Sequence, residues 1–204
     1  MEGQLREAVD ILRGGGIVAF PTDTVYGLGA DSANEEAIRK IYAAKERPLH
    51  TALPLLLSSI TQIADVARDI PQIAWQLAER FLPGGLTLVL YRLPSISPII
   101  AGGSDKIAVR VPDHPVPVGI VEGLGRPITG TSANLSGRPD PLTADQVREQ
   151  MGASIDLVID GGRCYGGTAS TVIDLTTEPP VILRQGVVSR EDIGSVCVVS
   201  MKEA

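Results

Sequence analysis

The chain has 204 residues, of which 44% are hydrophobic and 21% are charged, and this is the composition of a globular protein. Its length favours one domain, or at most two small ones, and we expect a single domain over residues 1–204. The formal net charge of −6 argues against a nonspecific nucleic-acid coat, which needs an excess of Lys and Arg. The N-terminus has no apolar signal core and no apolar run approaches about 18 residues, so we expect a cytoplasmic protein without a membrane span.

Helices and strands are predicted in mixed order in the first half. Apolar residues at helical spacing predict a helix that ends at Gly14–Gly16, and "IVAF" is typical of a buried strand. The stretch "SANEEAIRKIYAAK" predicts a helix capped by Ser32 or Asn34. "ALPLLL" predicts a strand, placed at a sheet edge because of Pro54. "SITQIADVARDI" and "PQIAWQLAERF" predict two helices separated at Pro71.

The second half contains more strand than helix. "GLTLVLYR" and "KIAVRV" predict strands, and "HPVPVGIVEGLG" predicts a short helix that ends at glycine. "RPITGTSANLSGRPDP" predicts a strand that opens into a polar loop, and "TADQVREQM" a helix capped by Thr143. "DLVID", "STVIDL" and "PVILRQG" predict three further strands, and "SREDIG" a helical turn. The lack of strict alternation favours one mixed sheet covered by helices.

The stretch "PTDTVYGLG" is the first candidate site. It follows a predicted strand and offers the hydroxyls of Thr22 and Thr24 and the ring of Tyr26. Gly27 and Gly29 permit tight turns and a close approach of ligand to backbone. On its own, the stretch fits a hydrogen-bonded turn equally well.

Two further segments carry groups suited to phosphate. In "KERP", Lys45 and Arg47 offer a point charge and a bidentate fork, although in isolation they are better explained as residues that satisfy a helix C-terminus. In "TSANLSG", residues 131–137, small hydroxyl and amide residues follow a strand and precede a glycine. Such a loop can cradle phosphate, and a solvated loop would look similar.

Other polar residues are spread over three segments. Arg110 and Arg184 lie at the ends of apolar runs, where a buried arginine needs an anionic partner, from the protein or from a substrate. Ser170 and Thr171 precede the stretch "VIDL". His114 in "DHP" is interpreted as a turn residue and not as a catalytic base.

Several site classes are excluded. There is no GxxxxGK[ST] motif, no dinucleotide-binding GxGxxG context, and no GxSxG around Ser132. Asp160 and Asp174 are interpreted as strand-end residues and not as a catalytic carboxylate pair. Cys164 and Cys197 form no CxxC, and with two histidines they give no familiar zinc spacing, so reduced thiols are favoured.

Taken in order, "PTDTVYGLG", "AKERP", "FLPGGLTLVL", "AVRVPDHP", "TSANLSG", "STVIDL" and "ILRQG" resemble the YrdC-like threonylcarbamoyl-AMP synthases over nearly the whole chain. The resemblance implies a single-domain α/β fold with a twisted, mostly open mixed sheet, flanking helices and a concave electropositive cavity. It also implies that L-threonine, bicarbonate and ATP with Mg²⁺ become threonylcarbamoyl-AMP and pyrophosphate. A threonylcarbamoyl transferase complex would then use the product on adenosine 37 of tRNA.

The resemblance also assigns roles to residues. It implies that Thr24, Arg110 and Ser170 bind threonine, and that five residues contact the nucleotide, namely Lys45, Arg47, Ser132, Asn134 and Arg184. Among these, the K-x-R pair of Lys45 and Arg47 is the candidate catalytic pair, and Tyr26 is expected to form a wall of the pocket.

Two positions depart from the family pattern. The segment after Pro48 lacks the Asn and the threonine-contacting His of many members, and His50 lies too early to replace that histidine. Lys106 stands where other members have a small hydroxyl residue that contacts ATP, so that contact is not assigned. Three alternatives therefore stay open: an RNA-binding module without adenylation activity, an O-carbamoyltransferase-type relative that acts on carbamoyl phosphate, and a paralogue that has lost the reaction.

Overall fold

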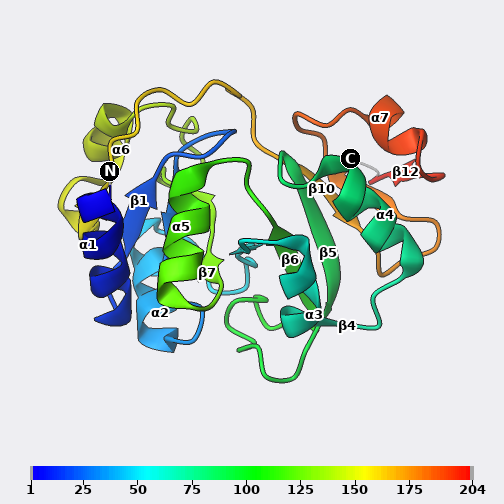
Figure 1. Ribbon diagram of the computed structural model, residues 1–204, viewed down its shortest axis with the longest axis horizontal. Coiled ribbons are helices and arrows are strands. Elements are labelled where there is room, and N and C mark those ends of the chain that lie inside the picture. The colour runs from blue at the N-terminus through cyan, green and yellow to red at the C-terminus, as the bar shows by residue number, and fades with distance from the viewer. Residues whose placement is uncertain (1, 203–204) are drawn as a thin grey trace.

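A computed structural model describes residues 2–202 of the chain. Figure 1 shows the strands in two groups side by side, with helices on the outer sides of both. One group is a four-stranded sheet in the order β8-β2-β1-β9, and the other is an eight-stranded sheet in the order β12-β11-β10-β5-β6-β3-β7, with β4 paired to β5. Both sheets contain parallel and antiparallel pairs, for example β10 with β5 and β5 with β6. The expected mixed α/β fold is confirmed, but its strands form two sheets and not one.

The elements have the following bounds. The helices are α1 (Glu2–Arg13), α2 (Glu35–Ala44), α3 (Ile63–Val66), α4 (Gln72–Phe81), α5 (Pro115–Leu124), α6 (Ala144–Met151) and α7 (Arg190–Gly194), with 3₁₀ turns at η1 (Ile60–Gln62) and η2 (Gly152–Ser154). The strands are β1 (Val18–Phe20), β2 (Gly27–Gly29), β3 (Leu55–Leu56), β4 (Ala67–Arg68), β5 (Leu86–Arg92), β6 (Lys106–Arg110), β7 (Ile128–Thr129), β8 (Thr131–Ser132), β9 (Leu157–Val158), β10 (Thr171–Asp174), β11 (Val181–Arg184) and β12 (Ser200–Met201).

Local capping explains where the predicted helices begin. Asn34 caps α2, because its side chain accepts a hydrogen bond from Ala37 N at 3.1 Å, and this decides between the two predicted caps. His114 caps α5 by accepting from Val116 N through Nδ1, as expected for a turn residue. The helix ends at Gly125, whose φ of 77° is readily adopted by glycine.

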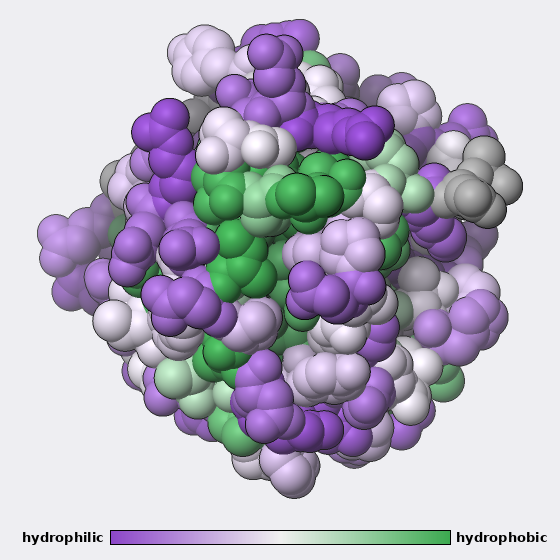
Figure 2. Space-filling view, turned by 90° about the vertical axis from the view of Figure 1, so that its right-hand side faces the viewer, coloured by the Kyte–Doolittle hydropathy of each residue, from purple (hydrophilic) through white to green (hydrophobic). Residues whose placement is uncertain are grey.

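Two hydrophobic cores hold the sheets and helices together. The larger one buries the inner sides of α2, α4 and α6 together with β5 and β6. The smaller one packs α1 and α5 against β1, with Leu12, Phe20 and Ile120 fully buried, and Figure 1 shows α1 and α5 on the same flank as β1. In Figure 2, hydrophobic side chains gather near the centre of the opposite flank and hydrophilic ones surround them. Within residues 2–202, no helix is long and apolar enough to cross a membrane.

The helix predicted at "SITQIADVARDI" is mostly wrong. It is reduced to a 3₁₀ turn and the single helical turn of α3, after which the chain becomes strand β4. Ala67 and Arg68 pair with Arg92 and Tyr91 of β5. The Arg68 guanidinium also lies 5.2 Å from the centre of the Tyr91 ring. Pairing with a distant strand therefore overrides the helical periodicity of this segment.

The predicted edge position of the "ALPLLL" strand is also wrong. Strand β3 lies inside the eight-stranded sheet, between β6 and β7. Pro54 precedes the two paired residues and takes part only through its carbonyl, which accepts from Gly130 N at 2.8 Å. Since proline lacks only the donor, it is tolerated beside an interior strand in this register.

The strand predicted at "RPITGTS" is divided between the two sheets. Ile128 and Thr129 pair with β3, whereas Thr131 and Ser132 pair with β2 of the four-stranded sheet. Gly130 lies between them, and a Cβ there would stand 2.3 Å from Leu56 Cγ. The close approach of Leu56 therefore favours glycine where the chain passes from one sheet to the other.

Candidate active site

A cavity of about 360 Å³ lies between the two sheets. One wall comes from the β1–β2 loop and β8 of the four-stranded sheet, and the other from β5, β6, β10 and β11 of the eight-stranded sheet. The cavity lining includes six of the eight predicted site residues, namely Thr24, Arg47, Arg110, Ser132, Ser170 and Arg184. The fold therefore brings together residues that are up to 160 positions apart in the sequence.

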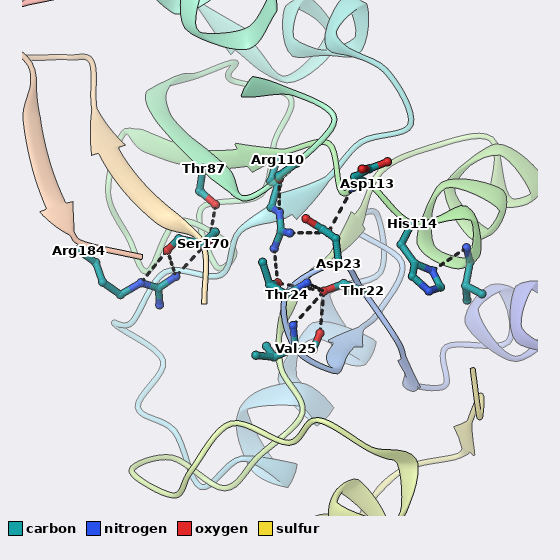
Figure 3. A network of polar contacts seen from close by, with 12 residues as sticks. Thr22, Asp23, Thr24, Val25, Thr87, Arg110, Asp113, His114, Ser170 and Arg184 are labelled. Atoms are coloured by element: carbon teal, nitrogen blue, oxygen red, sulfur yellow. Dashed lines mark hydrogen bonds and ion pairs between the residues drawn. The ribbon is translucent and has the colours of Figure 1, made fainter. Parts of the chain in front are cut away.

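Arg110, at the end of β6, is held in one orientation by three acceptors. Its Nε donates to Gly84 O at 2.8 Å, Nη1 to Thr24 Oγ1 at 2.9 Å and Nη2 to Asp23 Oδ1 at 2.6 Å. Figure 3 shows Asp23 and Thr24 converging on the guanidinium from the same loop. The side chain is only 8% exposed, and burial lowers the pKa of Arg110 although Asp23 acts in the opposite direction. Two N–H groups of the fork are left for a ligand.

The β1–β2 loop is both a turn and part of the site. Thr22 Oγ1 donates to Val25 O at 2.7 Å and accepts from the backbone N–H of Thr24 at 3.1 Å, which is the hydrogen-bonded turn that the sequence also allowed. This turn presents Thr24 Oγ1 to Arg110 at the cavity wall. Both threonines line the cavity, and Thr22 in addition holds the loop that carries Thr24.

The second part of the predicted threonine site lies at the start of β10. Ser170 Oγ is 2.8 Å from Thr87 Oγ1, and Arg184 Nη2 donates to Ser170 O at 2.9 Å and to Ser170 Oγ at 3.2 Å. Thr87 lies on β5 and lines the cavity, although it belongs to no motif that identifies it from the sequence. Its alternation with buried Leu86 and Leu88 would have placed it on the opposite face of the strand from them.

Tyr26 does not line the cavity, contrary to expectation. It is fully buried, and its hydroxyl donates to Gly162 O at 2.8 Å in a loop of the four-stranded side. Gly27 and Gly29 are likewise explained by packing, because a Cβ at either position would lie 2.9 or 2.8 Å from the ring of Phe20. Tyr26 and Gly29 therefore belong to the core, whereas Gly27 also lines the cavity.

Lys45 and Arg47 have different surroundings. Lys45 is 2% exposed, and its Nζ donates to Ser132 O, to Asn134 O at 2.7 Å and to Asn134 Oδ1 at 3.1 Å. Burial, and secondarily the charge of Arg47, lowers the pKa of Lys45 to about 8. Three acceptors occupy the three hydrogens of the ammonium. Lys45 thus fixes the "TSANLSG" loop.

Arg47 lies on the cavity wall. Its Nη1 donates to Thr131 Oγ1 at 3.1 Å and its Nη2 to Ala52 O at 3.2 Å. A neighbouring pocket of about 300 Å³ is lined by polar groups that include Lys45, Asn134 and Ser136, and it shares Arg47 and Ser132 with the larger cavity. The two hollows therefore meet at an arginine fork and a serine, a suitable place for an anion that extends through both.

Lys106 lines the cavity on the same strand as Arg110. Its Nζ lies 2.9 Å from Asp174 Oδ2, and Asp174 also accepts from the N–H and hydroxyl of Thr176 at 2.9 and 2.6 Å. Burial tends to raise the pKa of Asp174, but the hydrogen bonds from Thr176 and Lys106 outweigh it, so the pKa is lowered. Asp174 is a strand-end residue as predicted, and it holds Lys106 in place.

The described part of the chain offers no side-chain cage for a metal ion. Among residues 2–202, no group of three or more His, Cys, Asp or Glu side chains is placed to hold one. Mg²⁺ often binds through substrate phosphates and water with few protein ligands. The donor set of the cavity, hydroxyls and cations, is therefore compatible with an ion that enters bound to a polyphosphate.

Comparison with known proteins identifies the family. The family model named Sua5_yciO_yrdC, described as "Telomere recombination", matches residues 10–186. The chain belongs to the Sua5/YciO/YrdC family. This confirms the resemblance predicted from the ordered motifs.

Curated relatives and solved structures of the family agree with this. A threonylcarbamoyl-AMP synthase of Pyrococcus abyssi is 45% identical over 195 residues, which are 96% of this chain and 57% of that protein. One of Bacillus subtilis is 41% identical, over 95% of this chain and 56% of that protein. The crystal structure of P. abyssi Sua5 complexed with L-threonine matches with a TM-score of 0.94 and 43% identity, over 98% of this chain and 59% of that one. The chain thus spans little more than half the length of these relatives.

Proposed function

We propose that this chain catalyses the formation of threonylcarbamoyl-AMP and pyrophosphate from L-threonine, bicarbonate and ATP. The observation that carries the proposal is that Arg110 and Arg47 lie in the walls of one cavity. Arg110 is a buried fork suited to a carboxylate, and Arg47 stands where the cavity and the neighbouring polar pocket meet. A reaction that joins an amino acid to a nucleotide needs these two kinds of site side by side.

Threonine would bind at Arg110, Thr24 and Ser170. The two remaining N–H groups of the Arg110 fork would receive its carboxylate, and the hydroxyls of Thr24 and Ser170 would contact its polar groups. Thr87 adds a further hydroxyl next to Ser170. The curated relatives named above are threonylcarbamoyl-AMP synthases, and one solved relative is described as complexed with L-threonine, which supports this assignment.

The phosphates of ATP would lie at Arg47, Ser132 and Arg184. Arg47 and Ser132 line both hollows, so a triphosphate at this junction would extend from the cavity into the polar pocket. Lys45 and Asn134 would act mainly by holding the loop that carries Ser132. Lys45 also lines the polar pocket, so the phosphate contact predicted for it stays a prediction beside this positioning role.

The proposed reaction requires no covalent intermediate with the enzyme. The amine of threonine adds to carbon dioxide, derived from bicarbonate, and loses a proton to give a carbamate. A carbamate oxygen then forms a bond to the α-phosphorus of ATP, and the bond to the β-phosphate oxygen breaks as pyrophosphate leaves. The chain would contribute position and positive charge, which are large terms in phosphoryl-group chemistry. Mg²⁺ bound to the triphosphate would neutralise part of its charge.

The product of this reaction is a mixed anhydride, which is an activated acyl donor. We propose that a separate threonylcarbamoyl transferase consumes it to modify adenosine 37 of tRNA, and that the chain works in the cytoplasm.

Pyrophosphate release from ATP, Mg²⁺ and bicarbonate, with and without L-threonine, tests the proposal. We expect threonine-dependent release, a product with the mass of threonylcarbamoyl-AMP, and at least a hundredfold loss in Arg47→Ala and Arg110→Ala. Arg39→Ala is the matched control, because Arg39 is an exposed arginine of α2. Release that is independent of threonine, or activity that survives in both cavity variants, would contradict the proposed function.

A further inference from the structure

Three arginines line the cavity, and within residues 2–202 only one of them forms an ion pair. Arg110 Nη2 lies 2.6 Å from Asp23 Oδ1. Arg47 and Arg184 donate to hydroxyl and carbonyl oxygens, and no Asp or Glu of residues 2–202 forms an ion pair with either of them. The four cations that line the cavity are therefore of two kinds. Arg110 and Lys106 are each paired with a carboxylate, whereas Arg47 and Arg184 form no ion pair within the described residues, and only Asp140, at longer range, offsets the charge of Arg184.

Asp23 is itself held in place and joins the two sheets. It lies on the β1–β2 loop of the four-stranded sheet, whereas Arg110 belongs to β6 of the eight-stranded sheet. Asp23 Oδ1 accepts from Arg110 Nη2 and, at 3.2 Å, from the backbone N–H of Asp113. Figure 3 shows its carboxylate between these two donors. The side chain is 18% exposed, so solvent screens the pair only in part.

The neutralised pair and the free arginines should prefer different anions. An amino acid is a zwitterion whose carboxylate needs a fork of donors but little net positive charge. Pyrophosphate and triphosphate carry several negative charges, so their binding depends strongly on uncompensated cations. A buried arginine without Asp23 would attract either anion, and Arg110 lies near enough to Arg184 for the two charges to repel each other.

We propose that Asp23 determines which anion Arg110 accepts: it cancels the charge that would draw phosphate to this arginine, and it fixes the fork for the carboxylate of the amino acid. This inference rests on the proposed function and assigns to it a further residue that determines specificity. Asp23 does not line the cavity, so it acts through Arg110 and is a positioning residue.

Titration with inorganic pyrophosphate and with L-threonine tests this inference. In the natural chain we expect pyrophosphate to bind at one site and threonine affinity to be unchanged when that site is saturated. In Asp23→Asn, which keeps the shape but removes the charge, we expect at least a tenfold loss of threonine affinity, a second equivalent of bound pyrophosphate, and competition between pyrophosphate and threonine. Asp23→Glu restores the charge with altered geometry, so it should weaken threonine binding while still excluding the second pyrophosphate.

Asp113→Asn is the matched control. It removes an exposed carboxylate close to Asp23 but keeps the backbone N–H that donates a hydrogen bond to Asp23. The affinity for threonine and the pyrophosphate stoichiometry should therefore equal those of the natural chain. A purely structural ion pair would lower stability in Asp23→Asn without adding a pyrophosphate site, and that result would overturn the inference. If the natural chain bound no threonine, the proposed function would fail, and the pyrophosphate stoichiometry of Asp23→Asn would still decide the role of Asp23.

Discussion

Replacing Thr171 by valine tests which hydrogen bonds hold the segment 186–188 against β10 beside the candidate site. Thr171 is fully buried at the start of β10, next to Ser170. Its Oγ1 donates to Val188 O at 2.6 Å and accepts from Gly186 N at 2.9 Å. Valine has nearly the same shape but can make neither bond. The substitution therefore removes two hydrogen bonds without opening a cavity.

The expected loss of unfolding free energy follows from two backbone groups, Val188 O and Gly186 N, that lose their hydrogen-bond partner. An orphaned backbone group costs about 1–3 kcal/mol when buried, and both bonds are only partly buried, so we expect about 1 kcal/mol for each and about 2 kcal/mol in total. With a urea m-value of about 2 kcal/mol/M, the unfolding midpoint should fall by about 1 M. The fluorescence of Trp75, the single tryptophan, which packs against the larger core, reports the transition.

The control for this prediction is Thr177→Val. The hydroxyl of Thr177 is exposed and donates to Pro179 O at 3.1 Å, so its loss should change the free energy of unfolding by less than about 0.5 kcal/mol. The reasoning would be refuted if Thr171→Val also changed the free energy of unfolding by less than about 0.5 kcal/mol, or if both variants lost the same amount.

Two further predictions concern charged groups. Lys45→Met should release the loop that carries Ser132 and so lower ATP affinity at least tenfold, but lower threonine affinity less than threefold, as measured by separate titrations. The control is Lys40→Met, which removes one hydrogen bond of an exposed lysine of α2 and should change neither affinity. Equal losses of affinity for both ligands in Lys45→Met would contradict the prediction. Because the folded-state pKa of Asp174 is lowered, its ionised form stabilises the protein above the unfolded value of about 3.9, and this contribution is lost as pH falls through the folded value. Asp174→Asn should therefore reduce the loss of unfolding free energy between pH 7 and pH 3 in urea titrations, and an unchanged pH dependence would refute this role.

The local elements of the fold were predictable where the signal lies within one segment. The helix that begins after Asn34 and the helix that begins after Thr143 each carry their cap and apolar face in a short stretch of sequence. Helix α5 likewise lies between His114 and Gly125. Such elements need no information from the rest of the chain.

The sheet arrangement was not predictable in the same way, because it depends on distant partners. Ala67 becomes strand only because it pairs with Arg92, and the strand predicted after Pro127 divides at Gly130 because its two halves pair with different sheets. The local sequence of neither segment indicates which strand it pairs with. The division matters for function, since the cavity lies between the two sheets that it creates.

The candidate site was predictable as a set of residues but not as a set of roles. Thr24, Arg110 and Ser170 were identified from ordered motifs, and the structure brings all three to one cavity. Asp23 stands inside the same motif as Thr24, but nothing in the sequence shows that its partner is an arginine 87 positions away. Charge partners of this kind are set by tertiary contacts alone.

The K-x-R pair combines a helix end with a part of the candidate site. The structure has a helix C-terminal cap at this place: Glu46 takes a φ of 51°, its N–H donates to Ala43 O at 3.1 Å, and the N–H of Arg47 donates to Tyr42 O at 2.9 Å. These are the two bonds of a Schellman motif, so the helix ends here as predicted, although backbone N–H groups satisfy its carbonyls and the side chains of Lys45 and Arg47 bond elsewhere. The left-handed residue reverses the chain between the two cations. As a result Lys45 is buried under the "TSANLSG" loop, whereas Arg47 faces the cavity. The geometry of the helix end therefore gives the two side chains different surroundings and different proposed roles.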